Sequence, residues 1–147
     1  MNTDEVLARE ASAWQELRSV LAGVPVERRT EEGVVPGWSP QDLVWHCGFW
    51  AGYVARELEA LAAGTTFEVE VPEDTGPGDD LNERVHAESR TMTWEEAFDR
   101  SEQERERARS AFAAAGPPTE QLVADFAGET YDHYDEHRLE LAAFLGA

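Results

Sequence analysis

The chain has 147 residues, and its 31 acidic and 12 basic side chains give a net charge of −19, which should repel nucleic-acid phosphates and anionic membrane surfaces; we therefore expect neither as a partner. The single cysteine, Cys47, excludes an intramolecular disulfide framework, and the acidic opening Met1–Glu5 does not resemble a signal peptide. Since no apolar run approaches the roughly 20 residues of a membrane span, the composition predicts one soluble, cytoplasmic domain over residues 1–147.

The first half of the chain predicts two long helices. Residues 3–22 carry apolar side chains at steps of three and four, and Thr3 is the expected N-cap. The second helix has the clearest start, because Ser39 precedes a proline and Asp42 completes a capping-box pattern. We expect this helix to end near Ala63.

Helical periodicity disappears over residues 65–80, which we predict to be a mobile loop or a cover over one end of the bundle. A short helix over 81–88 should follow, and then two further long helices over about 94–115 and 119–145, the first of them capped by Thr93. Four long helices with one long connection indicate an all-α, up-down four-helix bundle.

The last helix contains His133 and His137, which lie one turn apart and therefore on one face. They belong to a stripe at steps of three and four that a bundle helix turns inward, namely Val123, Phe126, Thr130, His133, His137, Leu141 and Phe144. His46 shares a face with Leu43 and Trp50 on the second helix, so it should also point inward. Three converging imidazoles are typical of a metal site with an open position, and they suit Zn²⁺, Ni²⁺ or Fe²⁺.

Several neighbours of these histidines have two interpretations. Asp42 and Glu129 lie one turn before His46 and His133, where a carboxylate could accept the second N–H of a ligand, although a helix cap and a solvated face explain them equally well. We interpret Cys47 as a small core residue and His86 as a surface histidine.

Three stretches resemble the DinB/YfiT-like superfamily, which includes the N-terminal domain of mycothiol-dependent maleylpyruvate isomerase. They are Gly37-Trp38-Ser39-Pro40 with Leu43-Val44-Trp45-His46, Met92-Thr93-Trp94-Glu95-Glu96, and His133-x3-His137. The resemblance implies an up-down-down-up bundle in which His46, His133 and His137 are the metal ligands. It also implies a low-molecular-weight thiol whose sulfur meets the metal. The stretch from Tyr131 to His137 is similar as well to the ClbS-like branch, whose members protect cells from reactive small molecules and need not hold a metal.

Together these observations predict a metal-dependent enzyme, with Zn²⁺ or Ni²⁺, that uses a thiol of the mycothiol type on a small electrophilic substrate. The alternative is a metal-independent binding or self-protection protein, and a third interpretation is that the histidines form a satisfied polar core. Arg105, on the inner stripe of the third long helix, is the candidate for binding a substrate or cofactor carboxylate, with an ion pair as the simpler explanation. The sequence leaves a homodimer open.

Overall fold

The computed structural model describes residues 1–68 and 77–146, with side chains described outside 69–80. Over these residues the secondary structure is helical, apart from one isolated bridge between Val35 and Trp38, so the expected all-α class is confirmed. The helices are α1 (Thr3–Ala22), α2 (Pro40–Ala63), α3 (Pro77–Ser89), α4 (Trp94–Ala114), α5 (Glu120–Glu129) and α6 (Tyr131–Gly146), with a short 3₁₀ turn η1 (Val26–Arg28).

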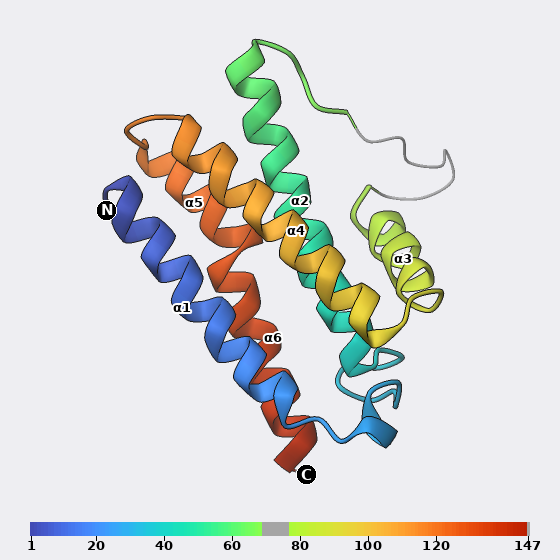
Figure 1. Cartoon of the computed structure of the whole chain (residues 1–147). Helices are drawn as coiled ribbons and strands as arrows, with labels where there is room; N and C mark the ends of the chain where they lie inside the picture. The colour runs from blue at the N-terminus through green and yellow to red at the C-terminus, as the bar shows by residue number, and fades with distance from the viewer. Residues whose placement is uncertain (69–76, 147) are drawn as a thin grey trace.

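The helices form a bundle with two parallel neighbours at its centre (Figure 1). α1 descends in that view, α2 and α4 both ascend, and α5 followed by α6 descends again, which is the expected up-down-down-up order. The parallel pair requires a long crossover, and the segment containing α3 provides it. None of the described helices is both long and apolar enough to cross a bilayer.

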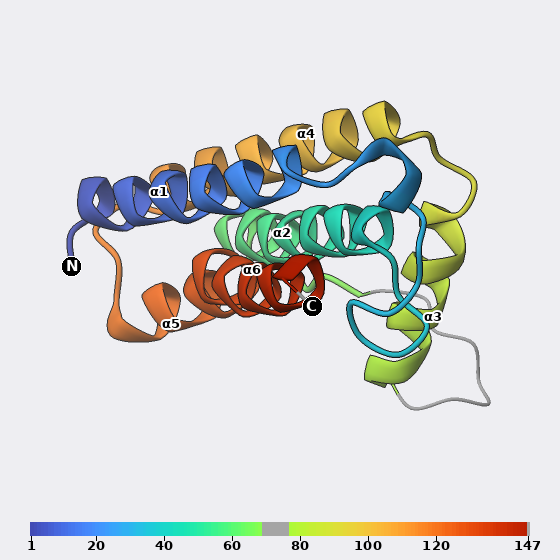
Figure 2. The same cartoon turned by 90° about the horizontal axis from the view of Figure 1, so that it is seen from below.

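Helix α2 lies in the middle of the bundle, between α4, α6 and the crossover helix α3 (Figure 2). Its first half buries residues on every side, from Pro40 through Gly48. A helix that is apolar on all sides is typical of a buried position. His46 lies in this first half of α2, so the protein interior surrounds it.

The predicted helix starts are confirmed for α2 and α4. The Ser39 hydroxyl accepts from the Asp42 N–H at 3.2 Å while the Asp42 carboxylate accepts from the Ser39 N–H at 2.9 Å, so the capping box is complete. Thr93 accepts from the Glu96 N–H in the same way. α1 differs by one residue, because Asn2 and not Thr3 provides the capping oxygen.

The expected continuous last helix is broken at Thr130, which separates α5 from α6. Thr130 leaves helical geometry, with φ −123° and ψ −101°, and its hydroxyl donates to the Phe126 carbonyl at 2.6 Å. Threonine side chains that bond back to a carbonyl four residues earlier compete with the regular helix ladder and bend it. The break changes which face of α6 points inward, so that Tyr134 is fully buried while His133 and His137 are only partly buried.

The connection between α2 and α4 also differs from expectation. α3 begins at Pro77, earlier than the expected start at Leu81. The predicted loop over residues 65–80 is wrong for 77–80, which belong to α3, and its residues 69–76 lie outside the described residues.

Candidate metal centre

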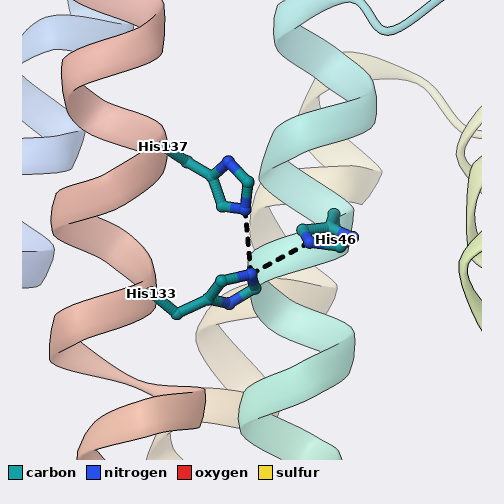
Figure 3. A group of neighbouring side chains, drawn as sticks. All are labelled: His46, His133 and His137. Carbon is teal, nitrogen blue, oxygen red and sulfur yellow. Dashed lines mark hydrogen bonds between the residues drawn. The ribbon is translucent and has the colours of Figure 1, made fainter. Parts of the chain in front are cut away.

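The three predicted histidines meet between α2 and α6 (Figure 3). Nε2 of His133 lies 2.9 Å from Nε2 of His46 and 2.8 Å from Nε2 of His137. The three ring centroids are 4.5 to 4.9 Å apart. The structure thus brings together all three side chains at one point, each by the same ring nitrogen.

The adjacent face of α6, which contains Tyr134, holds the two histidines in this orientation. Tyr134, next to His133 in the chain, points into the core, where its hydroxyl donates to buried Glu10 at 3.1 Å. The Tyr134 ring also packs against Trp14, with centroids 5.1 Å apart. Because this face of α6 is anchored to α1, the neighbouring face with His133 and His137 turns toward α2.

Protons cannot satisfy the contacts among these nitrogens. A ring nitrogen of imidazole carries either one hydrogen or one lone pair in the ring plane, yet Nε2 of His133 has two nitrogen neighbours at hydrogen-bonding distance. Protonation is unfavourable, because burial and then the neighbouring histidines lower the pKa of His46 to about 2, and burial and then His137 lower that of His133 to about 3. Near neutral pH, His46 and His133 are therefore uncharged.

This donor set fits a divalent cation. Zinc binds imidazole nitrogen at about 2.0–2.1 Å, which in a tetrahedral site places two ligand nitrogens about 3.3 Å apart. The distances of 2.8 and 2.9 Å are shorter by a few tenths of an ångström, so small side-chain movements suffice. Three imidazoles with no fourth protein ligand among the described residues are the arrangement of a site that keeps a position open.

The carboxylate that supports a histidine is not one of those expected. Nδ1 of His137 lies 2.9 Å from a carboxylate oxygen of Glu140, whereas Nδ1 of His46 and of His133 are buried without a partner in the described part of the chain. Sequence reasoning missed Glu140, although its spacing of three from His137 on one helix was a usable signal.

Neither Asp42 nor Glu129 has a hydrogen bond to a ligand histidine, and for Asp42 the alternative interpretation as a helix cap is confirmed. Asp42 is committed to the α2 cap and to the Ser89 hydroxyl. Glu129 borders a hollow that His133 also lines. Burial, followed by the nearby charge of Glu57, raises the pKa of Glu129 to about 7. Its carboxyl group can therefore take up or release a proton near neutral pH, close to the histidines.

Two surface hollows give access to the histidines, and both are bordered by His46, His133 and Asn82. One, of about 210 Å³, is completed by Trp50 and Glu129 among others. The second, of about 290 Å³, has the further lining residues Val35, Trp38, Leu43, Glu136 and His137. The Trp50 indole donates to the side-chain oxygen of Asn82 at 3.0 Å, which ties the α3 wall to the α2 wall. The hollows form one site approached from two sides of Asn82.

Arg105 lies elsewhere in the bundle. Its guanidinium donates to Glu10 at 2.9 and 2.6 Å and contacts Glu102 and Glu106, and Arg105 lines neither hollow. Only 8% of the residue is exposed. Arg105 therefore forms a buried ion pair with Glu10, which agrees with the simpler explanation. It is not part of the candidate site.

The two other residues considered from sequence have different outcomes. Cys47 is fully buried, and burial strongly raises the pKa of its thiol, in agreement with a core role. His86 is half-buried, more enclosed than a simple surface histidine, with Nε2 2.8 Å from the Gly37 carbonyl oxygen and its ring against Trp38. Since Trp38 also contacts the His46 ring, His86 supports a wall of the site and is not a ligand.

Comparison with known proteins adds a family and a set of similar folds. The model of the mycothiol maleylpyruvate isomerase N-terminal domain family matches residues 8–132. This match includes His46 and ends one residue before His133. The membership of His133 and His137 in the triad is therefore supported by the structure alone. No curated protein matches the chain at the sequence level.

Three solved structures share the fold at low sequence identity. An uncharacterised protein from Escherichia coli UTI89 aligns with a TM-score of 0.76 and 16% identity, over 97% of this chain and 91% of that chain. The colibactin self-resistance protein ClbS, in complex with double-stranded DNA, aligns with a TM-score of 0.80 and 15% identity, over 99% and 96%. A Streptococcus pneumoniae protein aligns with a TM-score of 0.69 and 12% identity, over 99% and 91%.

The ClbS structure corrects one expectation. We expected from the charge of −19 that nucleic acid is excluded as a partner. A protein of this fold has been solved with bound double-stranded DNA, so the fold is compatible with a nucleic-acid partner and the exclusion is withdrawn. Net charge is a property of the whole surface, and it does not decide what a local surface of this fold contacts.

Proposed function

Because the chain belongs to the mycothiol maleylpyruvate isomerase N-terminal domain family, we propose that His46, His133 and His137 hold one divalent metal ion in a metal-dependent enzyme. Zn²⁺ and Ni²⁺ suit the imidazole donors best. The reaction that we propose is the transfer or use of a low-molecular-weight thiol on a small electrophilic substrate. When bound, the metal would lower the pKa of a thiol or water that reaches it. The observation that carries this proposal is the convergence of three Nε2 atoms whose contacts no arrangement of protons satisfies.

The residues around the histidines have separable roles in this proposal. Glu129 takes up the proton that a thiol or water releases, since its pKa lies near neutrality. Trp38 and Trp50 provide apolar walls that limit the access of water to the site. Glu140 fixes the ring orientation of His137 by accepting from Nδ1. A cytoplasmic location, which suits a reduced thiol and the free Cys47, belongs to the same proposal.

The metal content of the protein tests the proposal directly. Wild-type protein purified without chelators, and then offered Zn²⁺ or Ni²⁺ and desalted, should retain one ion per chain. The variants His133→Ala and His137→Ala should retain none while keeping their helical circular dichroism. His86→Ala is the matched control, because it removes an imidazole near the same wall and should leave the metal content unchanged. Wild-type protein that retains no ion under these conditions would contradict the proposal.

A second candidate function is metal-independent binding or neutralisation of a reactive small molecule. The observation that favours it is the shared fold with the self-resistance protein ClbS, over nearly the whole of both chains. In that case a ligand would occupy the same two hollows, and exhaustive treatment with a chelator would leave binding or protection intact. Loss of function on chelation, restored by Zn²⁺ or Ni²⁺, favours the metal-dependent enzyme.

A further inference from the structure

Among the described residues that line the two histidine hollows there are acidic side chains but no arginine. Glu129 borders one hollow and Glu136 the other, while Glu140 contacts His137 from the same helix. No arginine is among the described lining residues of either hollow. Arg9 and the α6 residue Arg138 both lie beside Asp135, and Arg28 lies over the ring of Phe144 on α6. None of these arginines lines either hollow.

The walls of the site add a second preference. Trp38 and Trp50 each border one of the hollows, with ring centroids 5.1 and 6.5 Å from the His46 ring. Indole faces carry a negative quadrupole, so they attract cations as well as apolar groups. The two indoles therefore add no group that attracts an anion.

The excess of negative charge around the histidines remains when a divalent metal is bound. A divalent ion bound by neutral imidazoles contributes two positive charges, and Glu129, Glu136 and Glu140 outweigh them when ionised. Coordination of a thiolate adds one negative charge, and the proton that Glu129 can take up offsets no more than that charge. A further anionic group on the same ligand would then be repelled by these carboxylates at short range.

We propose that this site selects ligands by the charge of the part that does not reach the histidines. That part should be neutral or positively charged, because Glu129 and Glu136 repel anions. The inference rests on the proposed function, whose substrate class it narrows. The keto acid in the family's name is an anion, so this chain should act on a different class of electrophile, either uncharged or cationic.

Three thiols of fixed charge test this selection on protein loaded with Co²⁺ as a visible substitute for zinc. Thiocholine is cationic, 3,3-dimethyl-1-butanethiol is its neutral isostere, and 2-mercaptoethanesulfonate is anionic. Each is titrated at pH 8, where Glu129 is largely ionised, and binding is followed by the thiolate-to-cobalt absorption band. Because the thiols differ in intrinsic affinity for the metal, the quantity compared is the ratio of each Kd between wild type and Glu129→Gln/Glu136→Gln.

Neutralising the two carboxylates should change the three affinities in different directions. The Kd of thiocholine should rise about three- to tenfold, that of the sulfonate should fall by a similar factor, and that of the neutral thiol should change less than about twofold. Glu129→Gln alone should show the same pattern at reduced size, which protects the test if the double variant folds poorly. The matched control is Glu95→Gln/Asp99→Asn, which removes the same charge from exposed positions on α4 and should leave all three values unchanged.

The outcomes separate this inference from the proposed function. A normal cobalt spectrum, with the three Kd values unchanged or shifted by the same factor in the double variant, overturns the charge selection alone. The same directional shifts in the α4 control would assign the effect to net charge and would also overturn it. Absence of a cobalt spectrum in the wild type would contradict the metal site and, with it, the inference.

Discussion

Nε2 of His46 and Nε2 of His133 lie 2.9 Å apart, although the two residues are 87 positions apart in the chain. The contact depends on the central position of α2 and on the break at Thr130, which orients α6. His133 also contacts His137, so it is the middle member of the triad. A change in the packing of α6 against α1 or α2 should therefore alter the distances from His46 to both histidines of α6.

The contact between Glu140 and His137 leads to the first prediction. Glu140→Ala removes the acceptor of the His137 Nδ1 hydrogen, which orients the ring and raises its basicity as a ligand. Metal affinity should fall about 10- to 100-fold, as measured by competition with a chelator of known affinity. Asp132→Ala removes an exposed carboxylate from the same helix and should have a much smaller effect. Equal losses in the two variants would show that charge, and not the hydrogen bond, supports the site.

The buried ion pair between Glu10 and Arg105 leads to the second prediction. Glu10 is 0% exposed and accepts from Arg105, Arg109 and Tyr134, so Arg105→Ala leaves a buried carboxylate with fewer partners. The free energy of unfolding in urea should fall by about 3–5 kcal/mol. Arg107→Ala, which breaks an exposed pair with Glu59, should cost at most about 1 kcal/mol. Similar losses for the two arginines would contradict this account.

The close contact of α2 with α4 leads to the third prediction. A Cβ added at Gly48 would lie 2.5 Å from Cα of Ser101, whose hydroxyl donates to the Val44 carbonyl at 2.8 Å. Because the obstacle includes backbone, Gly48→Ala should separate the helices and lower the free energy of unfolding by about 1–3 kcal/mol or more. Gly128→Ala is the comparison, since it meets nothing within 4 Å and should be neutral or stabilise by up to about 1 kcal/mol. A stable Gly48→Ala protein would mean that α2 and α4 adjust easily.

Much of the fold could be predicted from local signals. The caps at Ser39 and Thr93 come from side chains that bond to backbone groups within one turn, so the sequence nearby is sufficient. The break at Thr130 could not be predicted in this way. It contains no proline, and its geometry is stabilised by the burial of Tyr131 and Tyr134, which depends on the other helices.

In the candidate site, too, some features follow from local sequence and others depend on residues from other helices. The convergence of His46 with His133 and His137 follows from helical spacing and a bundle topology, and the sequence contains both. The role of Arg105 could not be decided, because its partner Glu10 interrupts an apolar stripe on another helix. Glu10 does lie four residues after Val6 and three before Ala13, and this spacing, typical of an inward position, was the signal for a buried ion pair. Of the two interpretations of Asp42, the helix cap is confirmed and the support of His46 is not, because the cap and the α3 residues Ser89 and His86 occupy its carboxylate.

The stability of the metal-free protein should depend on pH through the triad. Burial and the neighbouring histidines lower the folded-state pKa of His46 to about 2 and of His133 to about 3, against about 6.5 in the unfolded chain. Between those values the unfolded state binds more protons than the folded state. The free energy of unfolding should therefore be highest above about pH 6.5 and should decrease as the pH falls, by up to about 2 kcal/mol for each histidine between pH 7 and pH 5.

Urea unfolding at pH 7, 6 and 5 in the presence of a chelator measures this dependence. The 31 acidic residues also titrate as the pH falls, so the informative quantity is the difference between wild type and His46→Asn/His133→Asn at each pH. That variant retains the acidic surface and lacks the two perturbed imidazoles, so the wild type should lose stability relative to it on acidification. Saturating Zn²⁺ should restore the wild type most strongly at pH 7, where protons compete least for the ligands, and should have no effect on the variant. Curves that remain parallel from pH 7 to pH 5 without metal would show that the histidines are solvated or paired in the folded protein, and the structural basis of the proposed metal site would then be wrong.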